Sequence, residues 1–120
     1  MKILTIMGTP HKGNTRAVVD LFLKEFENEK NTFDEIVIPK DFDNICLGCA
    51  NCILYGEDKC PHYKDINPLI KKIEEADLII IGTPVFVGSC TGGLKAFLDH
   101  MAYMWLVHRP SASMFNKVGR

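Results

Sequence analysis

The first thirty residues constrain the fold most strongly, because an extended run changes directly into helical periodicity across a glycine-containing loop. Lys2–Met7 is rich in aliphatic residues and ends at Gly8-Thr9-Pro10, which is typical of a strand followed by a turn. From Asn14 the apolar residues recur at helical spacing, with Asn14 as a plausible N-cap. We expect a strand over 2–7, a loop over 8–15 and a helix that fades around 28–31. The apolar positions of this helix are Ala17, Val18, Leu21, Phe22 and Phe26.

The rest of the chain continues the alternation of strand and helix. A second strand is predicted over 33–38, a helix over 65–76 with Pro68 in its first turn, and a strand over 78–81. The aliphatic run Leu78–Ile81 is typical of a strand buried on both faces of a parallel sheet. A third helix is marked by Leu94, Phe97, Leu98, Met101 and Met104 or Trp105, before residues 117–119 approach another strand. This order implies right-handed crossovers and a parallel sheet in one α/β domain over residues 1–120.

Composition excludes some classes of partner and compartment. The 14 lysines and arginines nearly balance the 15 aspartates and glutamates, which gives no electrostatic basis for binding nucleic acid or an anionic membrane. The chain opens directly into a strand-like run without the pattern of a secretion signal, so we expect a cytoplasmic protein. Its five cysteines are then expected as reduced thiols, metal ligands or redox groups rather than as a disulfide framework.

The loop over 8–15 has the properties of a phosphate-binding turn. A strand that passes into a helix through a tight loop directs unpaired backbone N–H groups and the positive end of the helix dipole at one point. Gly13 would let the backbone approach a ligand closely. The loop lacks the Gly-Lys-Ser/Thr ending of a Walker motif and the Gly-x-Gly-x-x-Gly of dinucleotide-binding folds. Further polar donors come from Thr9, His11, Asn14 and Thr15.

Two segments resemble one protein family. The loop over 8–15 resembles the FMN-phosphate loop of the NADPH-dependent FMN reductase and iron–sulfur flavoprotein families. The segment over 82–88, followed by Leu94-Lys95 and Asp99, resembles the family's loop after the third strand, although His100 stands where the family often has arginine. The resemblance implies a flavodoxin-like fold of strand order 2-1-3-4-5, with FMN at the carboxyl ends of the strands. It also implies that Pro84, Val85, Phe86, Val87 and Gly88 line the ribityl chain and the isoalloxazine. Either loop alone would also suit an ordinary turn without ligand, and their joint occurrence favours FMN.

The cysteine-rich stretch over 40–64 is the second chemical feature. Its spacing, Cys46-x2-Cys49-x2-Cys52-x7-Cys60 before Pro61, lets one loop surround a single centre and is similar to that of ferredoxins with 4Fe–4S clusters. The iron–sulfur flavoprotein family has a compact motif of this kind at this place. Zinc bound by the same thiolates and free thiols remain alternatives. Cys90 is expected to be a small, half-buried residue, and His62, His100 and His108 to be surface or capping residues, since they lack mutual ligand spacing.

The resemblance implies an FMN-dependent oxidoreductase that takes electrons from NAD(P)H or a ferredoxin-like donor. It implies a small-molecule or protein redox partner and a homodimer or homotetramer, and it supplies no catalytic acid or base. A non-enzymatic electron carrier, and a metal-binding or interaction module without turnover, are the alternatives. The sequence stops at Arg120, where the fourth strand would begin, so we expect a truncated domain in which one edge of the third strand lacks a neighbour unless oligomer contacts cover it.

Overall fold

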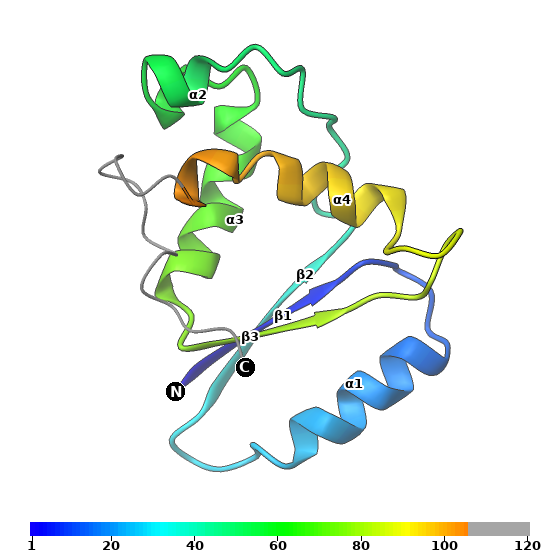
Figure 1. Cartoon of the computed structure of the whole chain (residues 1–120). Helices are drawn as coiled ribbons and strands as arrows, with labels where there is room; N and C mark the ends of the chain where they lie inside the picture. Colours follow the sequence, from blue (N-terminus) through cyan, green and yellow to red (C-terminus); the bar gives the residue numbers. More distant parts are fainter. Residues whose placement is uncertain (106–120) are drawn as a thin grey trace.

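The computed structural model describes residues 1–105, which form a parallel sheet with helices on both faces (Figure 1). The strands lie in the order β2-β1-β3, which matches the first three positions of the expected 2-1-3-4-5 order. The predicted flavodoxin-like α/β class is therefore confirmed. The elements are β1 (Lys2–Met7), α1 (Asn14–Lys24), β2 (Thr32–Val37), α2 (Asn51–Leu54), the short 3-10 turn η1 (Glu57–Lys59), α3 (Tyr63–Glu75), β3 (Leu78–Gly82), α4 (Gly92–Asp99) and the 3-10 turn η2 (Ala102–Trp105).

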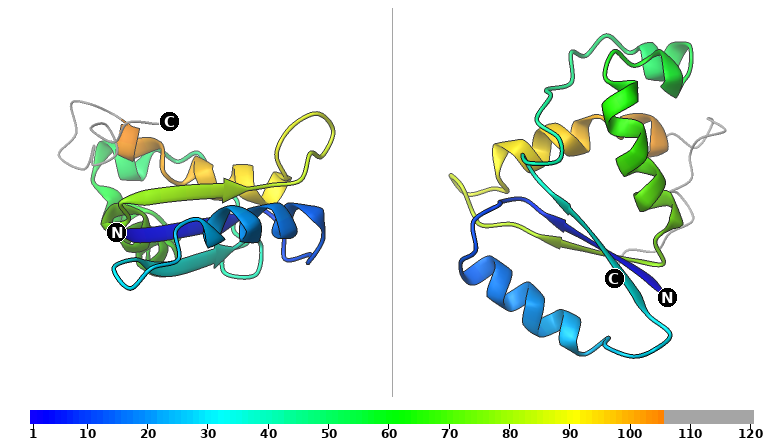
Figure 2. Two further views of the ribbon diagram at one scale, coloured as in Figure 1. Left: turned by 90° about the horizontal axis from the view of Figure 1, so that it is seen from below. Right: turned by 180° about the vertical axis from the view of Figure 1, so that it is seen from behind.

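The sheet divides the core into two layers, and its central strand is β1. It pairs in parallel with β2 and β3, so that Ile6 lies between Ile36 and Ile81. Because side chains alternate along a strand, Leu4 and Ile6 join the main cluster formed with α3 and α4. The odd-numbered residues of β1 face the other layer. There the side chains of Met7 and of Val19, which is on α1, lie close to Gly82. Figure 2 shows α1 on one face of the sheet and α3 with α4 on the other.

Helix α1 differs from the prediction at both ends. Gly13 occupies the N-cap position and no side chain caps the helix, so the prediction that Asn14 caps it is wrong. The helix ends at Lys24 rather than near residue 28. Beyond that end, the side-chain oxygen of Asn28 accepts hydrogen bonds from the N–H groups of Lys30 and Asn31 at 2.9 and 3.1 Å. Such local side-chain bonds favour a turn over continued helix.

Helix α3 begins two residues earlier than predicted, at Tyr63. Pro68 consequently lies inside the helix, beyond its first turn, where it removes one backbone hydrogen bond. The expected amphipathic pattern is confirmed, since the apolar face packs on the sheet. Its buried residues are Ile66, Leu69, Ile70 and Ile73.

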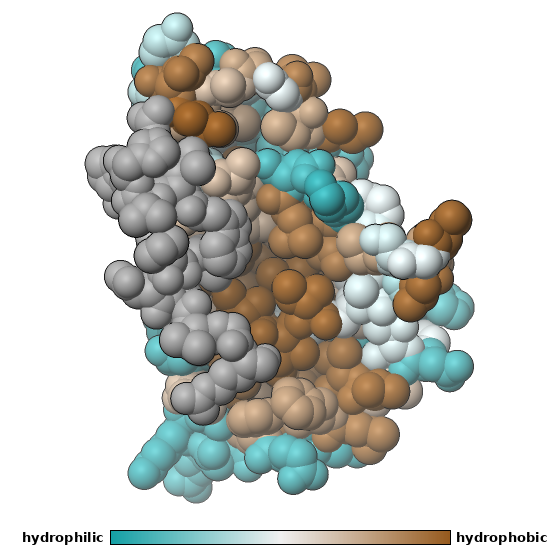
Figure 3. Space-filling model, viewed as in Figure 1, coloured by the Kyte–Doolittle hydropathy of each residue, from teal (hydrophilic) through white to brown (hydrophobic). Residues whose placement is uncertain are grey.

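Strand β3 is less buried than its aliphatic sequence predicts. Leu78, Ile79 and Ile80 are only partly buried, and Ile81 is 50% exposed. The reason is its position, since β3 lies at the outer edge of the described sheet and β1 takes the central place. Figure 3 shows apolar surface over this part of the molecule. The strand predicted near residues 117–119 lies outside the described residues. Over residues 1–105, no helix has the length and apolar character needed to span a bilayer.

Candidate functional site

The two loops that resemble the flavoprotein family, over 8–15 and 82–88, leave the sheet at the carboxyl ends of the adjacent strands β1 and β3 (Figure 1). The Gly8 N–H donates to the Gly82 carbonyl at 2.7 Å, so the two loops begin side by side. The carboxyl ends of parallel strands are where α/β proteins bind ligands. The structure therefore brings the two predicted groups of binding residues, those over 9–15 and those over 84–88, to the same end of the sheet.

The first loop, residues 8–13, presents an uncapped helix start. Because no side chain caps α1, the N–H groups of its first turn lack intrahelical partners and are available to an anion. Thr9 shapes the loop by accepting a hydrogen bond from the His11 N–H at 3.2 Å. A Cβ at Gly13 would lie 2.8 Å from the His11 ring, so glycine allows this ring to lie against the backbone. Thr9, Gly13 and Thr15 are half-buried, while His11 and Asn14 are exposed.

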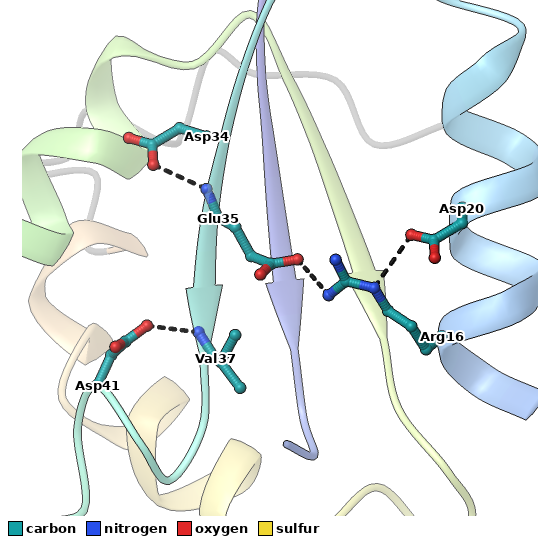
Figure 4. A network of polar contacts seen from close by, with 6 residues as sticks. All are labelled: Arg16, Asp20, Asp34, Glu35, Val37 and Asp41. Atoms are coloured by element: carbon teal, nitrogen blue, oxygen red, sulfur yellow. Dashed lines mark hydrogen bonds and ion pairs between the residues drawn. The ribbon is translucent and has the colours of Figure 1, made fainter. Parts of the chain in front are cut away.

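Arg16, in the first turn of α1, is not free to serve this loop. Figure 4 shows its guanidinium between two carboxylates, those of Glu35 on β2 and Asp20 on α1. Its Nη1 pairs with Glu35, and its Nε lies 3.0 Å from the Asp20 carboxylate. The same view shows Asp34 and Asp41 accepting backbone N–H groups of β2. Anion binding at the loop would thus depend on the backbone N–H groups and on the loop's own side chains rather than on Arg16.

The second loop forms a small hairpin with an apolar tip. Phe86 and Ser89 exchange backbone hydrogen bonds of 2.8 and 3.1 Å, and the two residues between them have positive φ values of 49° at Val87 and 75° at Gly88. This is the pattern of a two-residue hairpin turn. Val87 is fully exposed, and Val85 and Phe86 are also exposed. The hairpin therefore presents apolar side chains on which a flat ring could pack. It lies beside a helix start that suits an anion.

Two threonines join the loops, and neither was singled out from the sequence. The Thr91 hydroxyl donates to the Gly8 carbonyl at 2.6 Å and accepts the Leu94 N–H at 3.3 Å. The Thr91 N–H donates in turn to the Thr83 hydroxyl oxygen at 3.2 Å. We call this set of bonds among Gly8, Thr83 and Thr91 the threonine bridge. A threonine immediately before a predicted helix could have been recognised as its cap, but its bond to Gly8 depends on the tertiary fold.

The four cysteines of the predicted metal motif lie around one small cavity of about 30 Å³. Burial raises the pKa of the Cys52 thiol, and the neighbouring thiols of Cys60, Cys46 and Cys49 raise it further. Cys49 is exposed, the other three are half-buried, and none forms a disulfide. Four cysteines lining one cavity have the donor atoms that an iron–sulfur cluster or zinc requires. Within residues 1–105 no three His, Cys, Asp or Glu side chains are already arranged to hold a metal ion, so the ligands would have to move closer to bind one. Cys90 is half-buried elsewhere, as expected.

Two histidines line the same cavity. Both occupy helix cap positions, in agreement with the capping half of the prediction, with His62 at the N-cap of α3 and His100 at the C-cap of α4. His100 is buried rather than at the surface, and its Nε2 lies 3.0 Å from the Asn44 carbonyl oxygen. The rings of His62 and His100 meet edge to face, with centroids 5.3 Å apart. One ring nitrogen of each, His62 Nε2 and His100 Nδ1, is buried without a hydrogen-bond partner. Sequence spacing could not find this pair, because the fold alone brings α3 and α4 together here. His108 lies outside the described residues.

A larger hollow of about 260 Å³ lies at the opposite end of the sheet and includes Lys2, Thr32 and Asp34. Its charged groups satisfy one another, since Lys72 lies 3.0 Å from Asp34 and Lys2 lies 3.8 Å from Glu75. None of the predicted binding residues contributes to it. The carboxyl end of the sheet therefore remains the candidate site.

Comparison with known proteins agrees with the geometry. The family model of NADPH-dependent FMN reductases matches residues 1–119. An iron–sulfur flavoprotein of Archaeoglobus fulgidus is 35% identical over 92% of this chain and 49% of its own length. One from Methanocaldococcus jannaschii is 34% identical over 99% of this chain and 59% of its own. An FMN-dependent NADH:quinone oxidoreductase of Herminiimonas arsenicoxydans is 30% identical over 84% and 54%, respectively.

The chain thus spans about half the length of these relatives. The match nevertheless covers both loops at the carboxyl end of the sheet, the cysteine-rich stretch and all described helices and strands. Sequence similarity and the strand order β2-β1-β3 lead to the same assignment. The chain belongs to the NADPH-dependent FMN reductase family.

Proposed function

We propose that the chain binds FMN across its two loops and forms the flavin-binding part of an oxidoreductase. The observation that supports this most directly is the pairing of an uncapped helix start with an exposed apolar hairpin at one end of the sheet. FMN has the matching construction, with a phosphate at one end and a flat ring at the other. Membership of the family, and a relative named as an FMN-dependent NADH:quinone oxidoreductase, agree with this proposal.

Each loop would bind a different part of the cofactor. The phosphate would accept hydrogen bonds from the first turn of α1 and from Thr9, His11, Gly13, Asn14 and Thr15. The hairpin over 84–88 would contact the ribityl chain and the ring through Pro84, Val85, Phe86, Val87 and Gly88. Bound FMN supplies hydride and electron transfer chemistry, while the protein supplies position and backbone hydrogen bonds. We assign no catalytic acid or base.

NAD(P)H or a ferredoxin-like protein is the proposed electron donor, and a small molecule or protein the acceptor. Purification under anaerobic conditions with FMN, followed by flavin analysis, tests the cofactor. NAD(P)H oxidation is then measured with flavin, quinone and dye acceptors. We expect stoichiometric FMN and turnover with at least one acceptor. Failure to bind FMN would refute the proposed site. Reversible reduction by a ferredoxin without turnover would instead favour an electron carrier.

We further propose that Cys46, Cys49, Cys52 and Cys60 bind a 4Fe–4S cluster that exchanges single electrons with the flavin site. Their shared cavity and the names of two relatives support this assignment. A matched pair of variants tests it, namely Cys49→Ser in the motif and Cys90→Ser outside it. After anaerobic reconstitution, iron and acid-labile sulfide should be lost in Cys49→Ser and retained in Cys90→Ser, with FMN bound in both. Equal iron content in the two variants, or stoichiometric zinc in the wild type, would contradict the cluster.

A homodimer or homotetramer is the proposed assembly. Exposed apolar side chains on α1 and on the hairpin tip support self-association, because contiguous apolar surface is seldom left open to water.

A further inference from the structure

We propose that Thr91 is a positioning residue that fixes the phosphate loop relative to the hairpin, so that both ends of one FMN molecule bind together. The inference rests on the proposed function. It adds a role for a residue that is not among those proposed to contact FMN. Thr91 is only 5% exposed. Its role would therefore be exerted through the threonine bridge.

The hydrogen bonds of Thr91 have a defined direction. The Leu94 N–H can only donate, so the Thr91 hydroxyl oxygen accepts that bond at 3.3 Å. The hydroxyl proton is then free for the Gly8 carbonyl, an acceptor at 2.6 Å. One side chain thus caps α4 and ties the end of β1 to the start of that helix. Replacing it with an apolar side chain would leave the Gly8 carbonyl without this partner in a buried place, which is costly.

Gly8 has little freedom to move away from the bridge. Its N–H is bonded to the Gly82 carbonyl at 2.7 Å, so both of its backbone polar groups are held by the β3 side of the structure. A Cβ at Gly8 would lie 3.0 Å from the Thr83 hydroxyl oxygen and 3.1 Å from that of Thr91. The first residue of the phosphate loop is therefore packed directly against both threonines.

This arrangement has a thermodynamic consequence for a two-ended ligand. When two binding loops are fixed relative to each other, binding one end of a ligand raises the effective concentration of the other end at its site. If the loops can move, part of the binding free energy is spent on ordering them. Riboflavin lacks the phosphate and uses only the hairpin side. The preference for FMN over riboflavin therefore contains the phosphate's own binding free energy and the gain from holding the two loops together, and a variant that frees the loops should lower it.

The test compares Thr91→Val, which keeps the shape but removes the hydroxyl, with Thr91→Ser, which keeps it. Dissociation constants for FMN and riboflavin are measured on the apoprotein by quenching of flavin fluorescence. Thr91→Val loses both hydrogen bonds of the hydroxyl, of which only the one to the Gly8 carbonyl joins the two loops. We expect the loss of that bond to weaken FMN binding about tenfold and riboflavin binding less than about twofold. Thr91→Ser should retain the wild-type preference. Gly92→Ala is the matched control, because a Cβ at Gly92 meets nothing within 4 Å.

Each result has a definite meaning. Equal losses for FMN and riboflavin in Thr91→Val would overturn the proposal and indicate a general structural role. Wild-type protein that binds riboflavin and FMN equally would overturn it too, while wild-type protein that binds neither would refute the proposed function instead. If Thr91→Val does not fold, Thr83→Val removes the acceptor of the Thr91 N–H and leaves the α4 cap in place. A reduced FMN preference in Thr83→Val would support the threonine bridge, and an unchanged preference would overturn it.

Discussion

At the scale of single residues, Val87 combines an unfavourable backbone conformation with a fully exposed side chain. Its φ of 49° lies in the left-handed region, which β-branched residues rarely adopt. The side chain gains no burial in return, since it is fully exposed at the hairpin tip. Backbone strain without a packing benefit is often found where a side chain serves a ligand.

Val87→Asn should therefore separate stability from binding. Asparagine tolerates the left-handed region, so we expect the free energy of unfolding in urea to rise by about 1 kcal/mol. FMN affinity should fall, because the apolar tip is lost. Gly88→Ala is the control, since its φ is 75° with open space around the Cβ. The free energy of unfolding of Gly88→Ala should fall, because alanine is disfavoured at this positive φ and its Cβ meets no other atoms. A less stable Val87→Asn, or one with unchanged FMN affinity, would contradict this account.

Tyr103 gives a prediction about pH. Burial raises the pKa of its phenol well above the ordinary value, and the carboxylates of Glu57 and Glu74 raise it further. The folded protein thus favours the neutral phenol. Its contribution to stability is complete below the unfolded pKa of about 10 and is lost as the pH rises above that value. Urea unfolding of wild type and Tyr103→Phe between about pH 8 and 11 should show a steeper alkaline loss in the wild type. Parallel curves would count against a buried neutral Tyr103.

Sequence reasoning found residues whose chemistry is local and missed those whose role depends on tertiary contact. Gly13 was predicted from the loop sequence to let the backbone approach a ligand closely, and this stays a prediction; the structure places the His11 ring against it. Thr91 could not, because its bond to Gly8 joins residues far apart in the chain. The burial of His100 was missed for the same reason, as Phe42 and His62 surround its ring only in the folded chain.

At the scale of elements, Pro68 lies within α3 yet is exposed. It lacks the N–H that would bond the carbonyl four residues earlier, and it has no buried contacts to lose. Pro68→Ala should therefore raise the free energy of unfolding by about 1 kcal/mol, less than the full cost of an interior proline because proline also restricts the unfolded chain. FMN binding should not change, since α3 contributes to neither flavin loop. Thermal unfolding monitored by circular dichroism, with FMN titration, checks both expectations. A lower melting temperature would contradict them.

The elements that could be predicted are those with a sustained period. The strands β1 and β2 and the helices α3 and α4 follow from alternating or helical apolar spacing. The short helix α2 and the turn η1 within the cysteine-rich stretch were not predicted. They are too short to show a period, and their positions depend on packing of Cys52 and Ile53 against the main core. The end of α1 depends on the Asn28 turn, a local competitor that apolar spacing does not reveal.

At the scale of the whole molecule, apolar surface remains on the face of α1 away from the sheet. Val18, Leu21 and Phe22 lie at helical spacing and are all at least half exposed. Figure 3 shows further apolar surface near the β3 edge of the sheet. Patches of this kind commonly form contacts between protein chains. The sequence predicted the unpaired side of β3, but it did not predict the exposed face of α1, which was expected to be buried.

The 120-residue chain should therefore self-associate. Size-exclusion chromatography with light scattering should give at least twice the chain mass of 13.5 kDa. Val18→Lys combined with Leu21→Lys should shift the distribution toward the single chain, because lysines cannot be buried without cost. Lys24→Glu on the same helix is the control and should have no such effect. A single species of chain mass at every concentration would contradict the proposed dimer or tetramer.

Helix α4 has one further consequence for the molecule. Its N-terminus is capped by Thr91 beside the phosphate loop. Its C-terminus is followed by His100, which contacts the cysteine-rich stretch through the Asn44 carbonyl. An eight-residue helix is about 12 Å long and does not stretch. The helix therefore acts as a rigid spacer between the proposed flavin and metal sites. Inserting one residue in it would turn His100 by about 100° and move it about 1.5 Å along the axis. The length of α4 thus helps to set the separation of the two proposed sites.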